Sequence, residues 1–210
     1  MRRPALIFDF GNVVAHFDYR KATSALGARI GLSGEALLDR LGPLGFSGLV
    51  KSYESGRMTA EAFSRAVSDL VGLAITHHEF AAAWSDIFSA NEPVARLLAA
   101  LKRGGYTLVL GSNTNDLHAD QFRRQFAETL AHFDRLVLSY EVGHIKPSPA
   151  FYLACAQAAG AAPGDCIFID DLPENVEAAR ATGLIGLLYL ETAGLIRDLA
   201  ALGVDVAETA

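Results

Sequence analysis

The sequence contains few cysteines and no long apolar run. Cys155 and Cys166 are the only two cysteines in 210 residues, and neither belongs to a Cys-x-x-Cys or histidine-rich pattern. This scarcity disfavours structural zinc and fits a reducing cytoplasm. No apolar stretch reaches the roughly 20 residues that a membrane-spanning helix needs, so we expect no transmembrane segment. The apolar run behind Arg3 is interrupted at Asp9, so we also expect no signal peptide and a cytoplasmic location.

Basic charge is scarce as well. Lysine and arginine total 18 against 24 acidic residues, which gives a net charge of −6. The basic residues are scattered along the chain and form no stripe, so we expect no nucleic-acid partner. A hydrophobic share of 51% supports a compact protein with either one large domain or a core with a smaller inserted domain.

Short apolar runs are typical of buried parallel strands. They occur at residues 5–10, 106–111, 135–139, 166–170 and 185–190. Helical patterns separate most of them. Residues 150–159 follow the capping pair Ser148-Pro149, and this helix and the one at residues 173–182 both end at a glycine. The alternation predicts an α/β fold with a doubly wound, Rossmann-like parallel sheet.

The segment between the first two strands is much longer than a crossover requires, at roughly ninety residues, and contains no convincing strand. Its helix-period apolar positions predict helices at residues 19–28, 34–41, 59–71 and 77–88. We therefore expect an α/β core formed by residues 1–16 and 90–210. Residues 17–89 are expected to form a small helical cap domain over the active-site end of the sheet.

Polar residues follow the predicted strands at the sheet edge where ligands bind in open α/β folds. Asp9 comes directly after the first apolar run. Ser112 and Asn113 follow the second and lead into a helix, an arrangement that holds an anionic oxygen, although a plain helix cap is the alternative. Lys146 lies in a loop that Pro147 and Pro149 hold extended, which gives its ammonium group a defined position suited to phosphate.

Two adjacent carboxylates, Asp170 and Asp171, follow the fourth apolar run with no basic residue beside them. Magnesium uses one or two carboxylates together with substrate phosphate, so Asp9 and one of this pair predict a magnesium site. The alternative is that the pair stabilises the N-terminus of the following helix.

Four motifs in this order resemble the haloacid dehalogenase-like hydrolase superfamily across essentially the whole chain. They are Asp9-Phe10-Gly11-Asn12-Val13, Ser112-Asn113-Thr114, Lys146-Pro147 and Asp170-Asp171. Within the superfamily, the Gly-Asn-Val opening and residues 53–63 are similar to the bacterial alpha-D-glucose-1-phosphate phosphatase group. The resemblance implies that Asp9 attacks phosphorus and forms an aspartyl-phosphate, while Ser112 and Lys146 hold the phosphate oxygens.

The resemblance also implies the ligand sets. The expected Mg²⁺ ligands are three carboxylates and one backbone carbonyl: Asp9, Gly11, Asp171, and Asp170 either directly or through water. The expected substrate-binding residues lie next to the nucleophile, at the second strand end and in the cap: Phe10, Gly11, Asn113, Tyr53, Glu54 and Arg57. The last three are placed in a glycine-containing turn between cap helices that dips into the site, although a solvated connection is the alternative reading.

One position departs from the family pattern. Most phosphatases of the superfamily carry a second aspartate two residues after the nucleophile as general acid and base, and this chain has Gly11 there. A positioned acid or base contributes ~10²–10⁴-fold to the rate, so esters with poor leaving groups should be cleaved slowly. An anomeric sugar phosphate such as glucose-1-phosphate has an easier leaving group, and His16, Asp18 or a substrate hydroxyl are candidate substitutes for the acid.

The sequence therefore predicts a magnesium-dependent phosphatase that acts on a small phosphorylated metabolite, as a monomer or homodimer. A 2-haloacid dehalogenase is one alternative, because such relatives also lack the second aspartate, but they need no acidic pair. A catalytically weak protein that binds a phosphorylated ligand and regulates a partner is another. Gly11 is the best support for that alternative.

Overall fold

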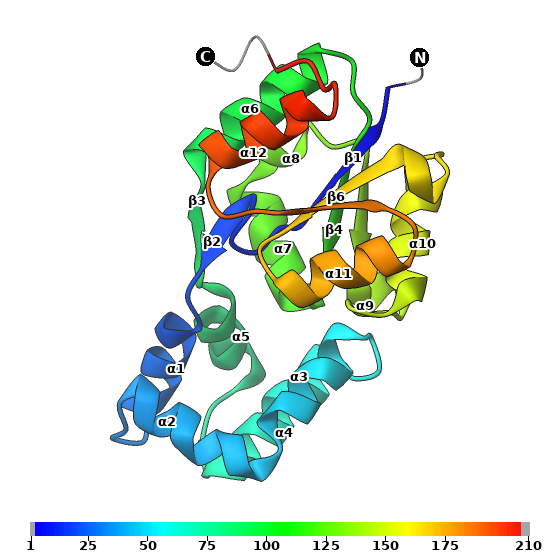
Figure 1. Ribbon diagram of the computed structural model, residues 1–210. Helices are drawn as coiled ribbons and strands as arrows, with labels where there is room; N and C mark the ends of the chain where they lie inside the picture. The colour runs from blue at the N-terminus through cyan, green and yellow to red at the C-terminus, as the bar shows by residue number, and fades with distance from the viewer. Residues whose placement is uncertain (1–2, 207–210) are drawn as a thin grey trace.

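The computed structural model describes residues 3–206 and has at its centre a sheet of five parallel strands. The strand order is β5-β4-β1-β6-β7 (Figure 1). The strands are β1 (Ala5–Phe8), β4 (Leu108–Ser112), β5 (Arg135–Leu138), β6 (Cys166–Asp170) and β7 (Ile185–Leu188). All five predicted strands are confirmed, and their ends differ from the expected ones by no more than two residues.

The central strand β1 is buried on both faces. It pairs in parallel with β4 and β6, so that Leu6 lies opposite Leu108 on one side and Ile167 on the other. Leu6 and Phe8 belong to one hydrophobic cluster, while Ala5 and Ile7 belong to a second cluster on the opposite face. Burial on both faces explains why the strand has a continuous apolar sequence and not an alternating one.

Helices cover both faces of this sheet, which confirms the doubly wound architecture. One face packs against α6 (Glu92–Arg103), α7 (Asp116–Gln125), α8 (Ala127–Leu130) and α12 (Thr192–Ala201). The other packs against α10 (Pro149–Ala158) and α11 (Pro173–Ala181), while the short α9 (Ser139–Val142) follows β5 directly. Single 3₁₀ turns occupy Gly42–Leu44 and Pro163–Asp165.

Five helices are inserted between β1 and α6, and Figure 1 shows them grouped together on one side of the core. They are α1 (Tyr19–Ala28), α2 (Gly34–Leu41), α3 (Phe46–Glu54), α4 (Ala60–Val71) and α5 (His77–Ser85). The first two coincide with their predictions because Asp18 and Ser33 accept N-cap hydrogen bonds from the first turns of α1 and α2. Helix α5 ends three residues earlier than predicted, before Phe88.

Helix α3 was not predicted, and the placement of Tyr53 and Glu54 in a turn was wrong. Both residues lie in the last turn of α3. Gly45, with a φ of 83°, and Gly48 lower the helical propensity of this segment, so its local sequence does not predict a helix. Tertiary packing holds it as a helix, since the Tyr53 ring stacks on Phe63 of α4 with centroids 4.5 Å apart.

The expectation of no strand in the inserted segment was also wrong. β2 (Ala15–Phe17) and β3 (Phe88–Ala90) form an antiparallel pair through which the chain enters and leaves the inserted helices (Figure 1). Each strand has only three residues, too few for a periodic pattern. Their pairing joins residues far apart in the sequence, such as Phe17 with Phe88, which no local pattern reveals.

Across residues 3–206, no helix is long and apolar enough to cross a lipid bilayer. The longest helices, α4 and α6, have 12 residues each.

Candidate active site

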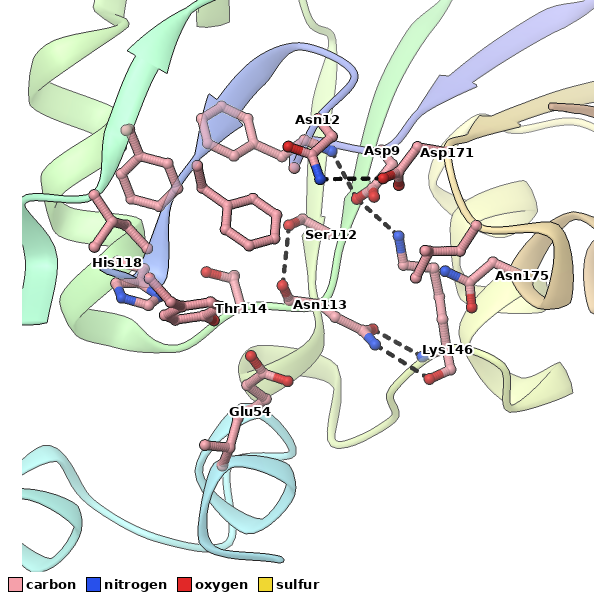
Figure 2. A pocket seen from close by; sticks show the side chains of 18 residues that line it. Asp9, Asn12, Glu54, Ser112, Asn113, Thr114, His118, Lys146, Asp171 and Asn175 are labelled. Carbon is pink, nitrogen blue, oxygen red and sulfur yellow. Dashed lines mark hydrogen bonds and ion pairs between the residues drawn. The ribbon is translucent and has the colours of Figure 1, made fainter. Parts of the chain in front are cut away.

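The charged residues singled out in the sequence meet at the carboxyl edge of the sheet. Asp9 follows β1, Ser112 ends β4, and Lys146 arrives from the loop before α10 (Figure 2). Asp170 ends β6. These residues surround or lie directly behind a cavity of about 320 Å³ between the sheet edge and the inserted helices. The arrangement brings side chains from four separate segments into one pocket.

A buried ion-pair network occupies the base of this cavity. The Lys146 Nζ lies 2.7 Å from Asp9 Oδ1 and 2.7 Å from Asp170 Oδ2, and its side chain is only 2% exposed. The Phe10 backbone N–H donates a further hydrogen bond to Asp9 Oδ1 over 2.7 Å. These contacts fix the Asp9 carboxylate at the point where β1 ends, with one face toward the cavity.

The network has more negative than positive charge. Burial raises the pKa of Asp9 to about 7, against the opposing effect of the Lys146 ammonium. Burial alone would lower the pKa of Lys146, but the charges of Asp9 and Asp170 outweigh it and raise that pKa, so the lysine keeps its proton. Burial also raises the pKa of Asp171. One ammonium therefore faces three carboxylates.

The three carboxylates could hold a metal ion. Asp9, Asp170 and Asp171 each offer an oxygen, and these oxygens lie within 4.8 Å of one another. Hard oxygen donors in this number suit Mg²⁺, and a divalent cation would offset the excess negative charge of the network. The residues present therefore fit the metal that the sequence predicted.

The two adjacent carboxylates play different structural parts. Asp170 is fully buried, and besides Lys146 it accepts hydrogen bonds from the Leu172 N–H and from Asn175 Nδ2, both over 2.9 Å. Asp171 Oδ2 accepts one from Asn12 Nδ2 over 3.1 Å. Because a carboxylate has about four acceptor sites, Asp171 keeps free capacity toward the cavity, whereas Asp170 is committed to the protein.

The loop after β4 positions Lys146. Asn113 Nδ2 donates to the Lys146 carbonyl over 3.1 Å, and the Lys146 N–H donates to Asn113 Oδ1 over 2.8 Å. The Asn113 side chain thus clamps the lysine backbone. The Ser112 hydroxyl makes only a long 3.3 Å contact with the Asn113 carbonyl, as Figure 2 shows, so a better acceptor can readily redirect it.

The inserted helices contribute Glu54 to the cavity. Figure 2 shows it on α3, with the carboxyl group directed toward the sheet edge that carries Asn113 and Thr114. Burial raises the pKa of Glu54 to about 7, while the positive charge of Lys146 acts in the opposite direction. Of the three cap residues that the sequence singled out, Glu54 is the one that lines this cavity.

Tyr53 and Arg57 lie elsewhere. The Tyr53 side chain is 2% exposed, and its hydroxyl donates to the Asp116 carboxylate at the start of α7. Arg57 is exposed beyond the end of α3. Tyr53 is therefore a contact between the inserted helices and the core.

A buried serine makes a second contact between the same two parts. The Ser139 hydroxyl donates to the Glu54 carbonyl over 2.6 Å and also lies 3.0 Å from the Thr114 carbonyl. The Thr114 N–H in turn donates to the Ser139 oxygen over 2.9 Å. A single side chain thus holds the last turn of α3 against the loop after β4. Nothing in the sequence around Ser139 signals this role.

Sequence reasoning also missed most of the cavity wall. Asn12 and Asn175 orient the acidic pair, and the Gly-Asn turn after Asp9 was the only local sign of either residue. The remaining walls are mainly apolar or aromatic side chains from both sides of the cavity: Phe17, Tyr19, Val50, Ile87, Phe88 and Leu172. Phe10 lines the cavity, and its ring packs into the core, with its centroid 4.3 Å from that of the Phe122 ring.

Gly11 lies against the ring of Phe17. A Cβ atom at position 11 would come within 2.7 Å of Phe17 Cε1 and 3.0 Å of Cδ1. Both distances are shorter than the 3.5–4.0 Å at which carbon atoms normally meet. The Phe17 ring therefore occupies the space that a side chain at position 11 would enter.

The fold and site are those of an α/β enzyme whose charged groups gather at the carboxyl edge of a parallel sheet. Residues 4–183 match the haloacid dehalogenase-like hydrolase family, and the chain belongs to this family. The chain is 29% identical over 186 residues to D-ribitol-5-phosphate phosphatase of Bacteroides thetaiotaomicron, covering 85% of this chain and 87% of that protein. It is 27% identical to a phosphatase of Mycobacterium tuberculosis, covering 95% and 94% of the two chains.

Solved structures share the fold. A haloacid dehalogenase-family enzyme from Bacteroides thetaiotaomicron superposes with a TM-score of 0.78 at 23% identity, over 90% of this chain and 94% of that one. The same enzyme has been crystallised with magnesium and inorganic phosphate, and in that form the TM-score is 0.76. The L-2-haloacid dehalogenase of Xanthobacter autotrophicus superposes with a TM-score of 0.65 at 17% identity, over 97% of this chain and 85% of that one.

Proposed function

We propose that this chain is a magnesium-dependent phosphatase that hydrolyses a small phosphorylated metabolite, with Asp9 as the nucleophile. The observation that carries the proposal is the position of the Asp9 carboxylate, 2.7 Å from a buried lysine and beside the Asp170-Asp171 pair at the base of a cavity. A site with one ammonium and room for a divalent cation suits the negative charge of a phosphoryl group.

Each residue of the network has a part in this reaction. Asp9 attacks phosphorus and forms an aspartyl-phosphate, which water then hydrolyses. Lys146 and Ser112 hold phosphate oxygens. The Asn113 side chain is engaged with the Lys146 backbone, so the group of Asn113 that we assign to the phosphate is its backbone N–H. Asp170 anchors Lys146 through their 2.7 Å ion pair.

Magnesium would be held by Asp9, Asp171 and the Gly11 carbonyl. When bound, it neutralises charge on the phosphate and on the carboxylates. Asp171 is the better ligand of the acidic pair, since the oxygens of Asp170 already accept three hydrogen bonds from the protein.

The substrate we propose is a sugar or polyol phosphate. The relative from Bacteroides thetaiotaomicron is named for D-ribitol 5-phosphate, and a cavity of about 320 Å³ accommodates a molecule of that size. Residues 17–89 would act as the cap domain that closes over it, because Glu54 and Val50 of α3 and Tyr19 of α1 line the cavity. Two buried, unpaired cysteines agree with our expectation of a reducing cytoplasm.

The test is phosphate release from a panel of sugar phosphates, polyol phosphates and other phosphometabolites, with magnesium and with chelator. Glucose-1-phosphate beside glucose-6-phosphate compares an anomeric with a primary ester. We expect release that requires magnesium and is abolished in Asp9→Asn, with the circular dichroism spectrum unchanged. Halide release from a 2-haloacid in chelator would favour a dehalogenase, and phosphate binding without turnover would favour a regulatory protein.

A further inference from the structure

Gly11 stands where the family usually carries its general acid, two residues after the nucleophile, and a side chain there would force the Phe17 ring to move. The Phe17 ring lies where a Cβ atom of residue 11 would begin, at 2.7 Å. The ring is held in turn by β2–β3 pairing opposite Phe88 and by an edge contact with Tyr19, with centroids 5.2 Å apart. The glycine and the phenylalanine together close position 11, so an acid must come from another part of the site.

Neither of the two residues that the sequence offered as substitutes for the acid lines the cavity. The Asp18 carboxylate caps α1 and pairs with Arg20 over 2.9 Å. His16 is exposed on β2 and lines an open depression that shares the lining residues Asn12 and Asp171 with the cavity.

Three titratable groups line the cavity but do not transfer a proton near neutral pH. Lys146 keeps its proton because Asp9 and Asp170 raise its pKa despite burial. Burial raises the pKa of the Tyr19 hydroxyl far above neutrality. Burial lowers the pKa of His118 to about 4, and both of its ring nitrogens are engaged, by the Trp84 carbonyl over 3.0 Å and by Asn115 Nδ2 over 3.1 Å.

Glu54 is differently placed. Its backbone carbonyl is fixed by the 2.6 Å bond from Ser139, while its carboxyl group makes no hydrogen bond to any other residue in 3–206. Figure 2 shows that carboxyl group on the cap side of the cavity, across from the charged network that holds Asp9 and Lys146. A substrate whose phosphate sits on that network would place its remaining part, beginning with the ester oxygen, on the side where Glu54 lies.

We propose that Glu54 is the general acid and base of this phosphatase, supplied by the cap in place of the residue that Gly11 and Phe17 exclude. The inference rests on the proposed phosphatase function. In the first step an Asp9 oxygen forms a bond to phosphorus as the bond to the ester oxygen breaks, and the Glu54 carboxyl proton passes to that oxygen to give the free alcohol. In the second step the Glu54 carboxylate takes a proton from the water whose oxygen forms a bond to phosphorus, as the bond from phosphorus to Asp9 breaks. This releases inorganic phosphate and restores the Asp9 carboxylate and the Glu54 carboxyl group.

This assignment gives a reason for the contacts that hold the cap against the core. The acid lies within reach of the substrate only while α3 packs on the core, and the Ser139 bond to the Glu54 carbonyl and the Tyr53 bond to Asp116 hold that packing. The other charged or titratable groups that line the cavity are Asp9, Asp171, Lys146, Tyr19 and His118. The cap contributes two titratable groups to this lining, Tyr19 and Glu54, and of these Glu54 has the pKa near neutrality.

The test compares Glu54→Gln with wild type on two esters in the presence of magnesium. One is 4-nitrophenyl phosphate, whose leaving group departs without a proton, and the other is the alkyl phosphate that the wild type cleaves fastest. We expect kcat/KM for the alkyl ester to fall by ~10²–10⁴-fold and that for the aryl ester to change little. With the alkyl ester, kcat/KM of the wild type should fall at alkaline pH as Glu54 loses its proton. This fall should be absent in Glu54→Gln. Glu35→Gln, an exposed glutamate of α2, is the matched control.

The outcomes separate this inference from the proposed function. Equal losses on both esters, or no loss on either, would overturn the acid role while leaving the phosphatase in place. Wild-type cleavage of aryl but of no alkyl esters would also overturn it. No turnover of any ester by wild type would refute the phosphatase itself. Circular dichroism of Glu54→Gln, an isosteric change, separates a lost proton donor from a lost fold.

Discussion

The closed position at Gly11 can be probed by adding a single methyl group. Gly11 is not among the glycines with a positive φ, so its backbone accepts an L side chain. In Gly11→Ala the new Cβ would lie 2.7 Å from Phe17 Cε1, and the ring must move by about 0.8 Å to restore an ordinary carbon contact. Its contact with Tyr19 and the pairing of β2 with β3 oppose that movement.

Two effects set the size of the change. Overpacking of this kind costs ~1–3 kcal/mol. Replacing glycine by alanine also lowers the conformational entropy of the unfolded chain, which offsets roughly 0.4–1 kcal/mol of the overpacking cost. The net loss is therefore centred on ~1.3 kcal/mol, which for a chain of this length lowers the Tm by roughly 3–5 °C.

The assay is thermal unfolding of a double-mutant cycle. Gly11→Ala is measured alone and in a Phe17→Ala background, where the ring is gone and the same change should be neutral or slightly stabilising. Gly194→Ala in α12 is the control, because its Cβ would meet its nearest neighbours at an ordinary 3.6 Å, and it should raise the Tm. Equal destabilisation by Gly11→Ala in both backgrounds would refute the steric account.

Two further predictions concern charge. Lys146→Met leaves the buried Asp9 and Asp170 carboxylates without their cation, so we expect a loss of ~3–5 kcal/mol in urea unfolding at pH 7 in chelator. Because burial raises the pKa of the Asp9 carboxyl and the variant lacks the opposing Lys146 charge, stability should recover as the pH falls. A loss independent of pH would contradict this. Burial raises the pKa of Glu54 from 4.5 to about 7, so its ionisation destabilises the fold above pH 4.5, with the full effect above pH 7. Since the side chain is only partly buried, Glu54→Gln should be about 1–2 kcal/mol more stable than wild type at pH 8 and equal to it at pH 4. A variant less stable than wild type at pH 8 would contradict this prediction.

Local pattern predicted the core of this protein well because its elements have strong local causes. The strands around β1 are buried on both faces and therefore read as continuous apolar runs. Helices α1 and α2 begin where Asp18 and Ser33 cap them. The charged residues meet because parallel strands deliver their carboxyl ends to one edge.

The missed features depend on contacts between distant parts of the chain. Helix α3 contains glycine and is held by the stacking of Tyr53 on Phe63, while β2 finds its partner only after five helices. The Ser139 bridge to Glu54 spans 85 residues. The Asn113 side chain clamps the backbone of Lys146, 33 residues away. Side-chain partners at such separations leave no periodic or spacing signal in a single sequence.

The most direct test of the central claim is to trap the phosphorylated enzyme. Wild type is mixed with magnesium and its best substrate, quenched in acid within one turnover, digested and mapped by mass spectrometry. We predict a phosphoryl group on Asp9, released by hydroxylamine as expected of an acyl phosphate, and absent in chelator and in Asp9→Asn. Turnover with a covalent phosphate on another residue, or undiminished turnover in Asp9→Asn, would contradict the account.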